Sequence, residues 1–338
     1  MDDTEGGAPL CTIEMDLAEL AKCTPSELHS PLFADLYNCE QRGYIARRGR
    51  AKLAWAAVDL DKHASMDGFI SQCRKVHKGN AVRDAIKAEK LGYYSKFFDL
   101  GSYIPDFVAI NISAPNRGGQ PMTPFYTRTV EECGGYPSRI APEQIPRQAA
   151  SWRRMFGLFR KLEGHRQGEV ASDEQLLAYM SLRRWGSFSF YGAFIGHADH
   201  LDEGIMYKMH FDLIRILMAA REDTSGADPS LECLKGIRFI GYTDYYGIRP
   251  SLLMWKKRAL FEPVCLECDY LSPDWAEALC KAAEHAPGDS TWQRHCAEML
   301  TAVTQSCLKD GRQREAAKAQ AELASVSQRL ASDSNAAA

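Results

Sequence analysis

A turn between a predicted strand and a predicted helix contains the residues best suited to chemistry. The turn spans Gly196 to Gly204 and includes His197 and His200. A neutral imidazole can act as a general base near neutral pH, and it can also bind a metal ion. The backbone N–H groups around Gly196 and Ala198 precede a helix start, where N–H groups lack intrahelical partners and suit a phosphate or another anion. The sequence therefore predicts a ligand site at this turn, with His197 as the candidate base and His200 as a candidate substrate contact.

The same turn also has a purely structural interpretation. Asp199, Asp202 and Glu203 place negative charge at the start of the predicted helix, where acidic side chains stabilise the helix dipole without a ligand. This charge opposes a bound phosphate. Two histidines three residues apart in a turn do not specify a metal site. The histidines are therefore left with structural or catalytic roles, and no metal ion is predicted.

A second candidate group follows the next predicted strand. Asp244, Tyr245 and Tyr246 lie where this strand meets a loop and a helix. Active-site groups in layered α/β proteins collect at such strand ends. A tyrosine has a pKa near ~10, so it can serve as a general acid at neutral pH. We therefore predict that Tyr245 or Tyr246 is an acid and that Asp244 contacts substrate, with packing of both rings against the sheet as the alternative.

Positive charge is concentrated in the stretch from Ser71 to Lys96. Its basic or potentially basic residues are Arg74, Lys75, His77, Lys78, Arg83, Lys87, Lys90 and Lys96. Such a face can bind the phosphates of a nucleotide cofactor or of a tRNA acceptor stem. A solvated helix face is the commoner explanation, so RNA is the less favoured partner. Lys78 is assigned to the phosphates of a cofactor.

Two further motifs are less specific. Arg117 precedes a Gly pair in a Pro- and Gly-rich loop, and its guanidinium can bind a carboxylate or phosphate of a substrate, although a surface turn is the plain alternative. Cys265 and Cys268 form a lone Cys-x-x-Cys pair, whereas a structural zinc site needs a second well-spaced pair. The chain contains no Walker-type loop, no His-Glu-x-x-His and no Gly-x-Ser-x-Gly motif.

The overall composition excludes several classes of protein. The chain has 338 residues, of which 45% are hydrophobic and 25% are charged, as in an ordinary globular protein with a sizeable core. A formal net charge of −3 gives no general attraction to nucleic acid. The residues from Met1 to Leu10 lack the features of a signal peptide, and no apolar run is long enough to span a bilayer. The 11 scattered cysteines fit free thiols in a reducing compartment, so we expect a cytoplasmic protein without a membrane partner.

These candidate residues need a framework of strands and helices to position them. Hydrophobic periodicity predicts strands at 52–60, 93–100, 155–162, 176–183, 188–195, 237–243 and 261–271. It predicts helices at 65–91 with a break at Gly79-Asn80, and at 104–112, 205–221, 250–260, 274–285, 291–308 and 312–330. This order indicates an α/β fold with a central sheet flanked by helices. The predicted division is an N-terminal segment at 1–50, a core at 51–271, a C-terminal helical extension at 272–330 and a disordered tail at 331–338.

From Lys52 to Leu260 the order of elements resembles the GNAT acyltransferase superfamily. The family pattern is a strand, two helices, a three-strand antiparallel meander, a helix, a strand and a helix. The resemblance implies a GNAT-like mixed central sheet whose fourth strand splays from the fifth, with the acyl thioester in the gap. It implies that the pyrophosphate of coenzyme A lies on the turn from Gly196 to Gly204, and that Tyr245 or Tyr246 protonates the departing thiolate. The loop is also similar to those of FemAB-type transferases, which share the fold and take an aminoacyl group from tRNA.

The expected function is transfer of an acyl or aminoacyl group from an activated thioester or ester donor to an amine acceptor. In this chemistry the protein holds two reactants together, polarises the carbonyl with backbone N–H groups and moves protons through a base and an acid. Acyl-coenzyme A is the expected co-substrate, and no tightly bound cofactor is expected. Two alternatives remain: a non-catalytic binding module that keeps the fold, and a tRNA-dependent aminoacyl transferase.

Overall fold

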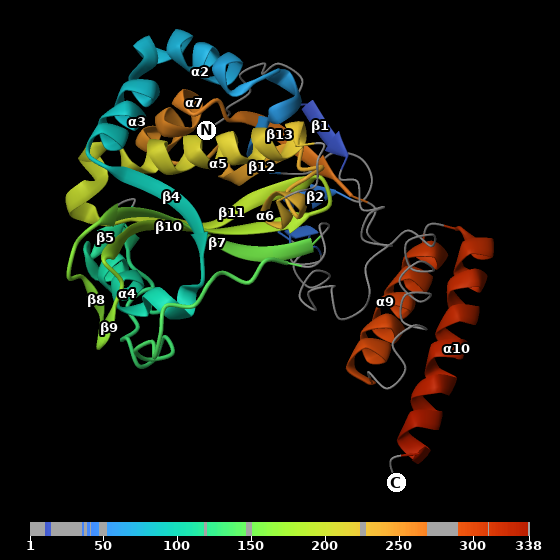
Figure 1. Cartoon of the computed structure of the whole chain (residues 1–338). Helices are drawn as coiled ribbons and strands as arrows, with labels where there is room; N and C mark the ends of the chain where they lie inside the picture. The colour runs from blue at the N-terminus through green and yellow to red at the C-terminus, as the bar shows by residue number, and fades with distance from the viewer. Residues whose placement is uncertain are drawn as a thin grey trace.

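A mixed sheet forms the centre of the molecule. The computed structural model of the chain describes residues 11–14, 36, 39–40, 42–46, 53–117, 120–146, 151–223, 228–268, 290–309 and 311–336. Within them, nine strands form one sheet in the order β1-β13-β3-β12-β11-β10-β7-β4, with β2 paired to β13 (Figure 1). The strands are β1 (Cys11–Glu14), β2 (Ile45–Ala46), β3 (Trp55–Asp59), β4 (Tyr93–Phe98), β7 (Ser151–Lys161), β10 (Glu174–Trp185), β11 (Phe188–Gly196), β12 (Phe239–Asp244) and β13 (Glu262–Glu267).

Helices cover both faces of this sheet. One face carries α2 (Met66–Lys75), α3 (Asn80–Lys90), α5 (Ile205–Glu222) and α7 (Pro250–Arg258) (Figure 1). The other carries α4 (Ile104–Ile112) and the small hairpins β5–β6 (Asn116–Arg117, Gln120–Pro121) and β8–β9 (Arg166–Gln167, Val170–Ala171). The short helix α6 (Pro229–Glu232) follows α5 in the chain, and α9 (Ser290–Lys309) and α10 (Gln313–Ala336) form a helical hairpin.

The antiparallel half of the sheet follows directly from the sequence. Strands β7, β10 and β11 are rich in aromatic and aliphatic residues, which favour a buried sheet. Trp185 of β10 pairs with Phe188 of β11, so only Gly186 and Ser187 connect the two strands. Gly186 has φ +57°, a value that a two-residue hairpin requires and that glycine adopts without a Cβ penalty.

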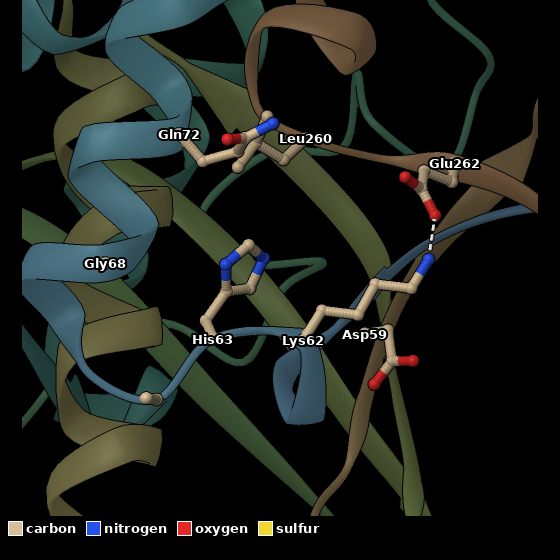
Figure 2. A pocket seen from close by; sticks show the side chains of 8 residues that line it. Asp59, Lys62, His63, Gly68, Gln72, Leu260 and Glu262 are labelled. Atoms are coloured by element: carbon tan, nitrogen blue, oxygen red, sulfur yellow. Dashed lines mark hydrogen bonds and ion pairs between the residues drawn. The ribbon is translucent and has the colours of Figure 1, made fainter.

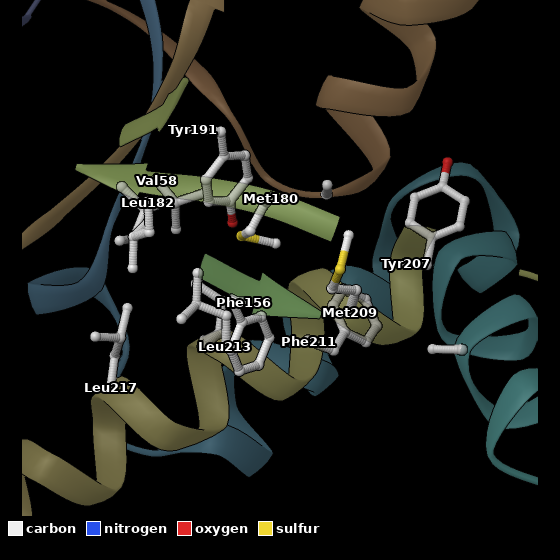
Figure 3. Close-up of a cluster of buried hydrophobic side chains, with 14 of the residues drawn as sticks. Val58, Phe156, Met180, Leu182, Tyr191, Tyr207, Met209, Phe211, Leu213 and Leu217 are labelled. Atoms are coloured by element: carbon white, nitrogen blue, oxygen red, sulfur yellow. The ribbon is translucent and has the colours of Figure 1, made fainter. Parts of the chain in front are cut away.

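The main hydrophobic core lies between the sheet and α5. Met209, Leu213 and Leu217 recur every four residues along α5 and are buried, because this spacing puts them on one side of the helix. They face buried side chains of the sheet such as Phe156 and Met180 (Figure 3). Full burial of one such side chain contributes about 1.5–3 kcal/mol. The core therefore fixes α5, and with it the turn that precedes α5.

The parallel pairing of β11 with β12 interrupts the antiparallel pattern in the middle of the sheet, in addition to the parallel pairs β1–β13 and β2–β13 near one edge. β11 pairs with β12 in parallel through Phe188↔Phe239, Ser189↔Ile240 and Phe190↔Gly241. Beyond these pairs, β11 continues to Gly196 alongside β10, while β12 continues to Asp244 alongside β3. The two strands therefore separate toward their C-terminal ends and leave a gap between them.

The fold class predicted from the sequence, a mixed α/β sheet flanked by helices, is confirmed. From β3 to α7 the elements follow the predicted order, and the 3₁₀ helix η3 (His77–Gly79) lies between α2 and α3 at the expected break. The predicted helix at 274–285 lies outside the described residues. Among the described helices, none combines the length and the apolarity needed to cross a membrane.

The last helix, α10, reaches into the segment that the sequence predicts to be a disordered tail. Disorder is predicted from residue 331 onward, but α10 continues to Ala336. The preceding part of α10 is rich in alanine, the residue with the highest helix propensity. Adding residues to an existing helix avoids the cost of nucleation, so the helix extends into the tail.

The start of α5 lies against the backbone of α3. Gly204 immediately precedes α5 and has φ +82°. A Cβ on Gly204 would lie 2.2 Å from the carbonyl oxygen of Asp84 in α3. Lys87 Nζ, one turn further along α3, donates a hydrogen bond to Asp202 O at 3.0 Å. Glycine is therefore required at position 204 by both its backbone conformation and the closeness of α3.

Replacement of this glycine tests the contact between α3 and α5. We expect Gly204→Ala to lower the free energy of unfolding by about 3 kcal/mol or more, because the methyl group adds a backbone clash to the cost of a left-handed alanine. Gly92→Ala is the matched control, since Gly92 has φ +83° and a Cβ added there would meet nothing within 4 Å. That control should lose about 1 kcal/mol in the same denaturant titration. Equal losses in the two variants would show that α3 does not constrain the turn.

Candidate functional site

The turn between β11 and α5 forms the end of the gap between β11 and β12. β11 ends at Gly196, the 3₁₀ helix η5 (Ala198–Glu203) follows, and α5 begins after Gly204. The N–H of His197 donates to Leu177 O of β10 at 2.7 Å. This hydrogen bond ties the turn to the sheet on the side away from β12.

His197 is held in its neutral form. Its side chain is 21% exposed, and its Nδ1 is buried without a hydrogen bond to any described residue. Asp199 Oδ2 lies 3.9 Å from Nδ1, which is beyond hydrogen-bond distance. Burial lowers the pKa of His197; Asp199 raises it, whereas His200 and Arg117 lower it further. At pH 7 the imidazole can therefore accept a proton, as a general base must.

His200 belongs to a hydrogen-bonded cluster with Tyr93 and Glu203. His200 Nδ1 lies 2.8 Å from the hydroxyl of Tyr93 and 2.8 Å from Glu203 Oε2. The Tyr93 hydroxyl also donates to Glu203. Burial and this carboxylate raise the pKa of Tyr93 to about 12, and the hydrogen bond from Tyr93 lowers the pKa of Glu203. The cluster joins β4 to η5. In this structure His200 therefore helps to hold the turn in place.

Two predicted binding groups, Ala198 and Arg117, meet at the hydroxyl of Ser113. Ser113 Oγ accepts a hydrogen bond from the N–H of Ala198 at 2.9 Å and another from Arg117 Nη2 at 2.8 Å. It donates to Ile110 O at 2.7 Å. Arg117 also donates to Gly196 O and to Ile110 O, at 2.7 and 2.6 Å. An oxygen held by two donors at these distances has the geometry of an oxyanion position, although in this structure the oxygen belongs to the protein.

Aromatic rings fill the gap between β11 and β12 on the side of α5 and α7. The ring centroid of Phe194 in β11 lies 5.3 Å from that of Tyr242 in β12 and 5.2 Å from that of Trp255 in α7. Tyr191 lies 5.6 Å from Tyr242, and its hydroxyl lies 2.7 Å from Nδ1 of the fully buried His210. The space in which the family resemblance places an acyl chain is thus occupied by the protein's own side chains.

Tyr126 packs against the cluster on the α4 face. It raises the pKa of Tyr179 and of Tyr242, for both of which burial is the larger cause. Tyr179 belongs to the cluster on the α4 face, whereas Tyr242 packs against the cluster on the α5 face. Tyr126 therefore acts electrostatically on a residue of each cluster. The sequence showed only a Pro- and Gly-rich loop here, so Tyr126 was missed as a candidate.

The second predicted group lies at the end of β12, across the gap from the turn. Tyr245 is buried, its N–H donates to Ala54 O at 2.9 Å, and burial raises its pKa. Tyr246 is 55% exposed, and its ring centroid lies 5.2 Å from that of Tyr245. Asp244 has a buried Oδ1 without a hydrogen bond to a described residue. No hydrogen bond or ion pair among the described residues joins this group to His197, so the two predicted groups are separate.

A buried lysine supports the end of β12. Lys256 is 0% exposed, and its Nζ donates to Tyr242 O, Asp244 O and Thr243 Oγ1, at 2.6, 2.5 and 3.1 Å. Burial lowers the pKa of Lys256 to about 8. Thr243 has φ +45°, an unusual value for a β-branched residue. The ammonium group therefore holds an irregular strand end. The sequence did not reveal this role, because a lysine in a helix is typically exposed.

The predicted basic stretch divides into two parts. On α2, η3 and α3 the charged side chains are exposed: Arg74, Lys75, His77, Lys78, Arg83, Lys87 and Lys90. Lys96 lies apart from them on the α4 face, where its Nζ lies 2.5 Å from Glu174 Oε1 and over the ring of Phe159. Lys78 lies in η3, whereas the part of α3 that contacts the turn is at Asp84 and Lys87. Lys78 is therefore part of an exposed face and does not contact the turn.

Two polar clusters under the sheet were absent from the sequence prediction. The first joins Asp106 of α4 to His165, with Nε2 3.0 Å from Asp106 Oδ1, and to Gln167, whose Nε2 donates at 2.6 Å. Burial raises the pKa of Asp106. The second surrounds Glu174; burial opposes ionisation there, but hydrogen bonds from Lys96, Tyr103 and Tyr94 hold the pKa of its carboxyl at about 2. The partners are 59 to 80 positions apart in the chain, so no local spacing could have shown these clusters.

The described residues contain no group of three or more His, Cys, Asp or Glu side chains that could hold a metal ion. Cys265 lies in β13 and Cys268 directly after it, and both are buried free thiols. Val264 and Leu266 beside Cys265 are buried as well, so this segment is covered on both faces. Burial of the two thiols needs no ligand, because Cys is one of the most frequently buried residues.

Comparison with known proteins gives limited information. No family model and no curated protein matches the chain. Among solved structures it is similar to the crystal structure of FemX, with 12% sequence identity and a TM-score of 0.39. The alignment covers 68% of this chain and 66% of that chain. At this level of similarity nothing about activity or substrate transfers to this protein, so the function proposed below rests on the geometry of this chain.

The buried His210 predicts how stability depends on pH. In the folded protein burial lowers the pKa of His210 to about 3, whereas an exposed histidine has a pKa of about 6.5. Between these values the unfolded chain binds more protons, so the stability that is complete above pH ~6.5 falls as the pH falls. We expect His210→Gln to reduce the loss of unfolding free energy between pH 7 and pH 5 by about 2 kcal/mol. Tyr191→Phe, which removes the neighbouring hydroxyl but keeps the imidazole, should retain the full pH dependence, and the same retention in His210→Gln would contradict the assignment.

Proposed function

We propose that this protein transfers an acyl or aminoacyl group from an activated ester or thioester donor to an amine acceptor. The observation that carries the proposal is the arrangement at the end of β11. A neutral imidazole, that of His197, adjoins an oxygen position held by Ala198 N–H and Arg117. Both flank the gap between two diverging parallel strands. A base beside an oxyanion position is what attack of an amine on an ester carbonyl requires.

His197 serves as the base in this proposal. The attacking amine must lose a proton as it bonds to the carbonyl carbon. Because Nδ1 is buried next to Asp199, the tautomer protonated at Nδ1 leaves the lone pair on Nε2 for this proton. Such a tautomer needs only a small movement of Asp199 to gain a hydrogen-bond acceptor for the Nδ1 proton. The proton accepted at Nε2 then passes to solvent or to the leaving group.

The oxyanion of the tetrahedral intermediate takes the place of Ser113 Oγ. Rotation of the Ser113 side chain would leave Ala198 N–H and Arg117 Nη2 directed at a substrate oxygen. Arg117 would remain in position, because it is also bound to Gly196 O and Ile110 O. A donor already fixed before reaction stabilises developing charge without reorganisation. Arg117 is therefore assigned to the carbonyl oxygen of the donor, in place of a substrate carboxylate.

A tyrosine is proposed as the acid that meets the leaving group. Tyr246 is the exposed member of the predicted pair, and Tyr126 packs on the α4 face and raises the pKa of Tyr242 in β12. Buried Tyr245, with its raised pKa, supports the end of β12. Tyr246→Phe and Tyr126→Phe separate the two candidates, since each removes one hydroxyl and keeps the ring.

The donor is proposed to be an activated ester or thioester, with acyl-coenzyme A as the first candidate to test. A second candidate function, transfer from an aminoacyl-tRNA ester, is favoured by the charge of the surface. The stretch 71–96 contains seven Lys and Arg residues against two acidic residues. Its exposed part on α3 adjoins the turn, whereas the turn itself carries three acidic residues that oppose a pyrophosphate. A ligand with phosphates spread along α2 and α3 fits this distribution of charge.

Replacement of His197 tests the proposed base. We expect His197→Asn to slow single-turnover transfer by ~10²–10⁴-fold, because a general base is lost without loss of core volume. His77→Asn is the matched control: it is an exposed histidine with φ +46°, a conformation that asparagine tolerates, and it should keep full activity. The measurement is transfer of a labelled group from acetyl-coenzyme A and, separately, from a mixture of aminoacyl-tRNAs, after matched unfolding curves. Full activity in His197→Asn, or no transfer by the wild type from either donor, would reject the proposal.

The salt dependence of binding tests the second candidate. We expect Lys75→Gln combined with Lys78→Gln to weaken binding of tRNA and to reduce the slope of log K against log salt concentration by about 1.4, since each lost contact removes about 0.7. Lys257→Gln combined with Lys309→Gln is the matched control, because these residues are exposed and lie on α7 and α9. An unchanged slope in the first variant would identify the face on α2 and α3 as merely solvated.

A further inference from the structure

A pocket of about 280 Å³ lies at the C-terminal end of β3, at the opposite end of the sheet's strands from the turn. Its lining residues come from two stretches that are distant in sequence. One runs from the end of β3 through the 3₁₀ helix η2 (Leu60–Lys62) into α2, and the other is the connection between α7 and β13 together with the first residue of β13. Asp59 pairs with Phe239, which in turn pairs with Phe188 at the start of β11. Gly196 lies eight residues further along β11, about 26 Å away at 3.3 Å per residue. The pocket is therefore distinct from the site at His197.

The imidazole of His63 projects into this pocket without a partner (Figure 2). No hydrogen bond joins its ring nitrogens to any of the described residues. One edge of the ring packs on Phe69, with centroids 5.1 Å apart and an interplanar angle of 84°. Burial lowers the pKa of His63, so the ring is neutral at pH 7. A half-buried, fixed and neutral imidazole offers one donor and one acceptor to a ligand.

Two carboxylates, those of Asp59 and Glu262, also line the pocket, and both lie on the Lys62 side of the imidazole (Figure 2). Asp59 uses Oδ1 to accept the N–H of Asp61, and among the described residues its Oδ2 accepts no hydrogen bond. Glu262 forms an ion pair with Lys62 across the opening of the pocket, and the two side chains are 58% and 50% exposed (Figure 2). Two carboxylates and one ammonium group leave a net negative charge on the lining. The uncharged wall is formed by Leu260, whose φ of +62° is a conformation that a leucine rarely adopts.

This lining selects the chemistry of a ligand. The acidic groups do not converge as metal ligands, because no group of three metal-binding side chains occurs among the described residues. Instead they are distributed around a cavity near the lower limit of the volumes that hold small organic molecules. We propose that this pocket binds a small organic cation with a primary ammonium group, which contacts Asp59 and Glu262 while its carbon chain lies along Leu260 and His63.

The proposed binding does not depend on transferase activity. A ligand ammonium group would donate to Asp59 Oδ2 and to Glu262, and it would displace Lys62 from its exposed ion pair. That displacement costs little, because exposed ion pairs contribute about 0–1 kcal/mol. Gln72, which also lines the pocket, offers an amide to a second polar group on the ligand.

The test uses 1,4-diaminobutane as the probe and the full-length protein. Calorimetric titration should show saturable binding of 1,4-diaminobutane, and NMR should show that it shifts the ring resonances of His63. The neutral 1,4-butanediol, the anionic succinate and Mg²⁺ alone should do neither. Asp59→Asn and Glu262→Gln should each weaken binding about tenfold or more, because each removes one charge-assisted hydrogen bond. Asparagine still caps η2, so Asp59→Asn keeps the fold.

A matched control and a third variant complete the test. Asp67→Asn removes the same charge from an exposed position on the first turn of α2, outside the lining, and should leave the affinity for 1,4-diaminobutane unchanged. If either carboxylate variant proves unstable, His63→Gln should still lose affinity for 1,4-diaminobutane while folding normally. Binding of 1,4-butanediol as tight as that of the diamine, or unchanged affinity in the Asp59→Asn and His63→Gln variants, would overturn the proposal.

Discussion

Three parallel residue pairs between β11 and β12 constrain the rest of the structure. Parallel neighbours cannot be joined by a tight turn, so the chain must cross over between them, and it does so through α5. The crossover fixes the turn at the C-terminal end of β11 and directs it toward α3. Beyond these pairs β11 follows its antiparallel neighbour β10, and β12 follows its antiparallel neighbour β3. The gap therefore opens between β11 and β12. The candidate site is therefore a consequence of strand pairing, and the residues at the gap are set by where pairing ends.

The turn is stabilised mainly by polar groups of the protein itself. Arg117 supplies donors to two carbonyls and to Ser113, and the hydroxyl of Ser113 in turn satisfies the N–H of Ala198. Buried polar groups carry a high cost when unpaired, and the Ala198 N–H, the Ser113 hydroxyl and both Nη groups of Arg117 are paired before any ligand is bound, whereas Arg117 Nε has no hydrogen bond to a described residue. Chemistry at this site then requires a ligand oxygen that replaces Ser113 Oγ and makes the same hydrogen bonds. The network thus favours a carbonyl oxygen, which can accept two donors, over an apolar group.

Charge is distributed unequally over the two sites. The turn carries acidic side chains, but Glu203 is used in hydrogen bonds with Tyr93 and His200, and its charge is partly satisfied there. The exposed cations lie on α2 and α3, and Lys87 of α3 contacts the turn. At the opposite end of the sheet's strands, the pocket around His63 has a net negative lining. One molecule therefore presents a surface suited to phosphates on α2 and α3 and a pocket suited to a cation, and this pocket lies about 26 Å from Gly196 along β11.

The sequence by itself determined the framework of the protein. Period-2 and helical patterns located the long strands β3, β4, β7, β10, β11, β12 and β13 and the helices α2, α3, α4, α5 and α7, because burial of apolar side chains dictates those patterns locally. They did not locate the hairpins β5–β6 and β8–β9 or the short helix α6. The sequence also located the turn, since glycines at positions 196 and 204 and the following amphipathic helix are adjacent in the chain. Tertiary structure alone decided which groups surround the turn. Arg117, Ser113 and Tyr93 reach it from segments 79 to 110 residues away, and the pocket around His63 unites β3 with β13 across about 200 residues. Such partners are selected by packing and by the need to satisfy buried polar atoms, which act through space and leave no spacing in the sequence.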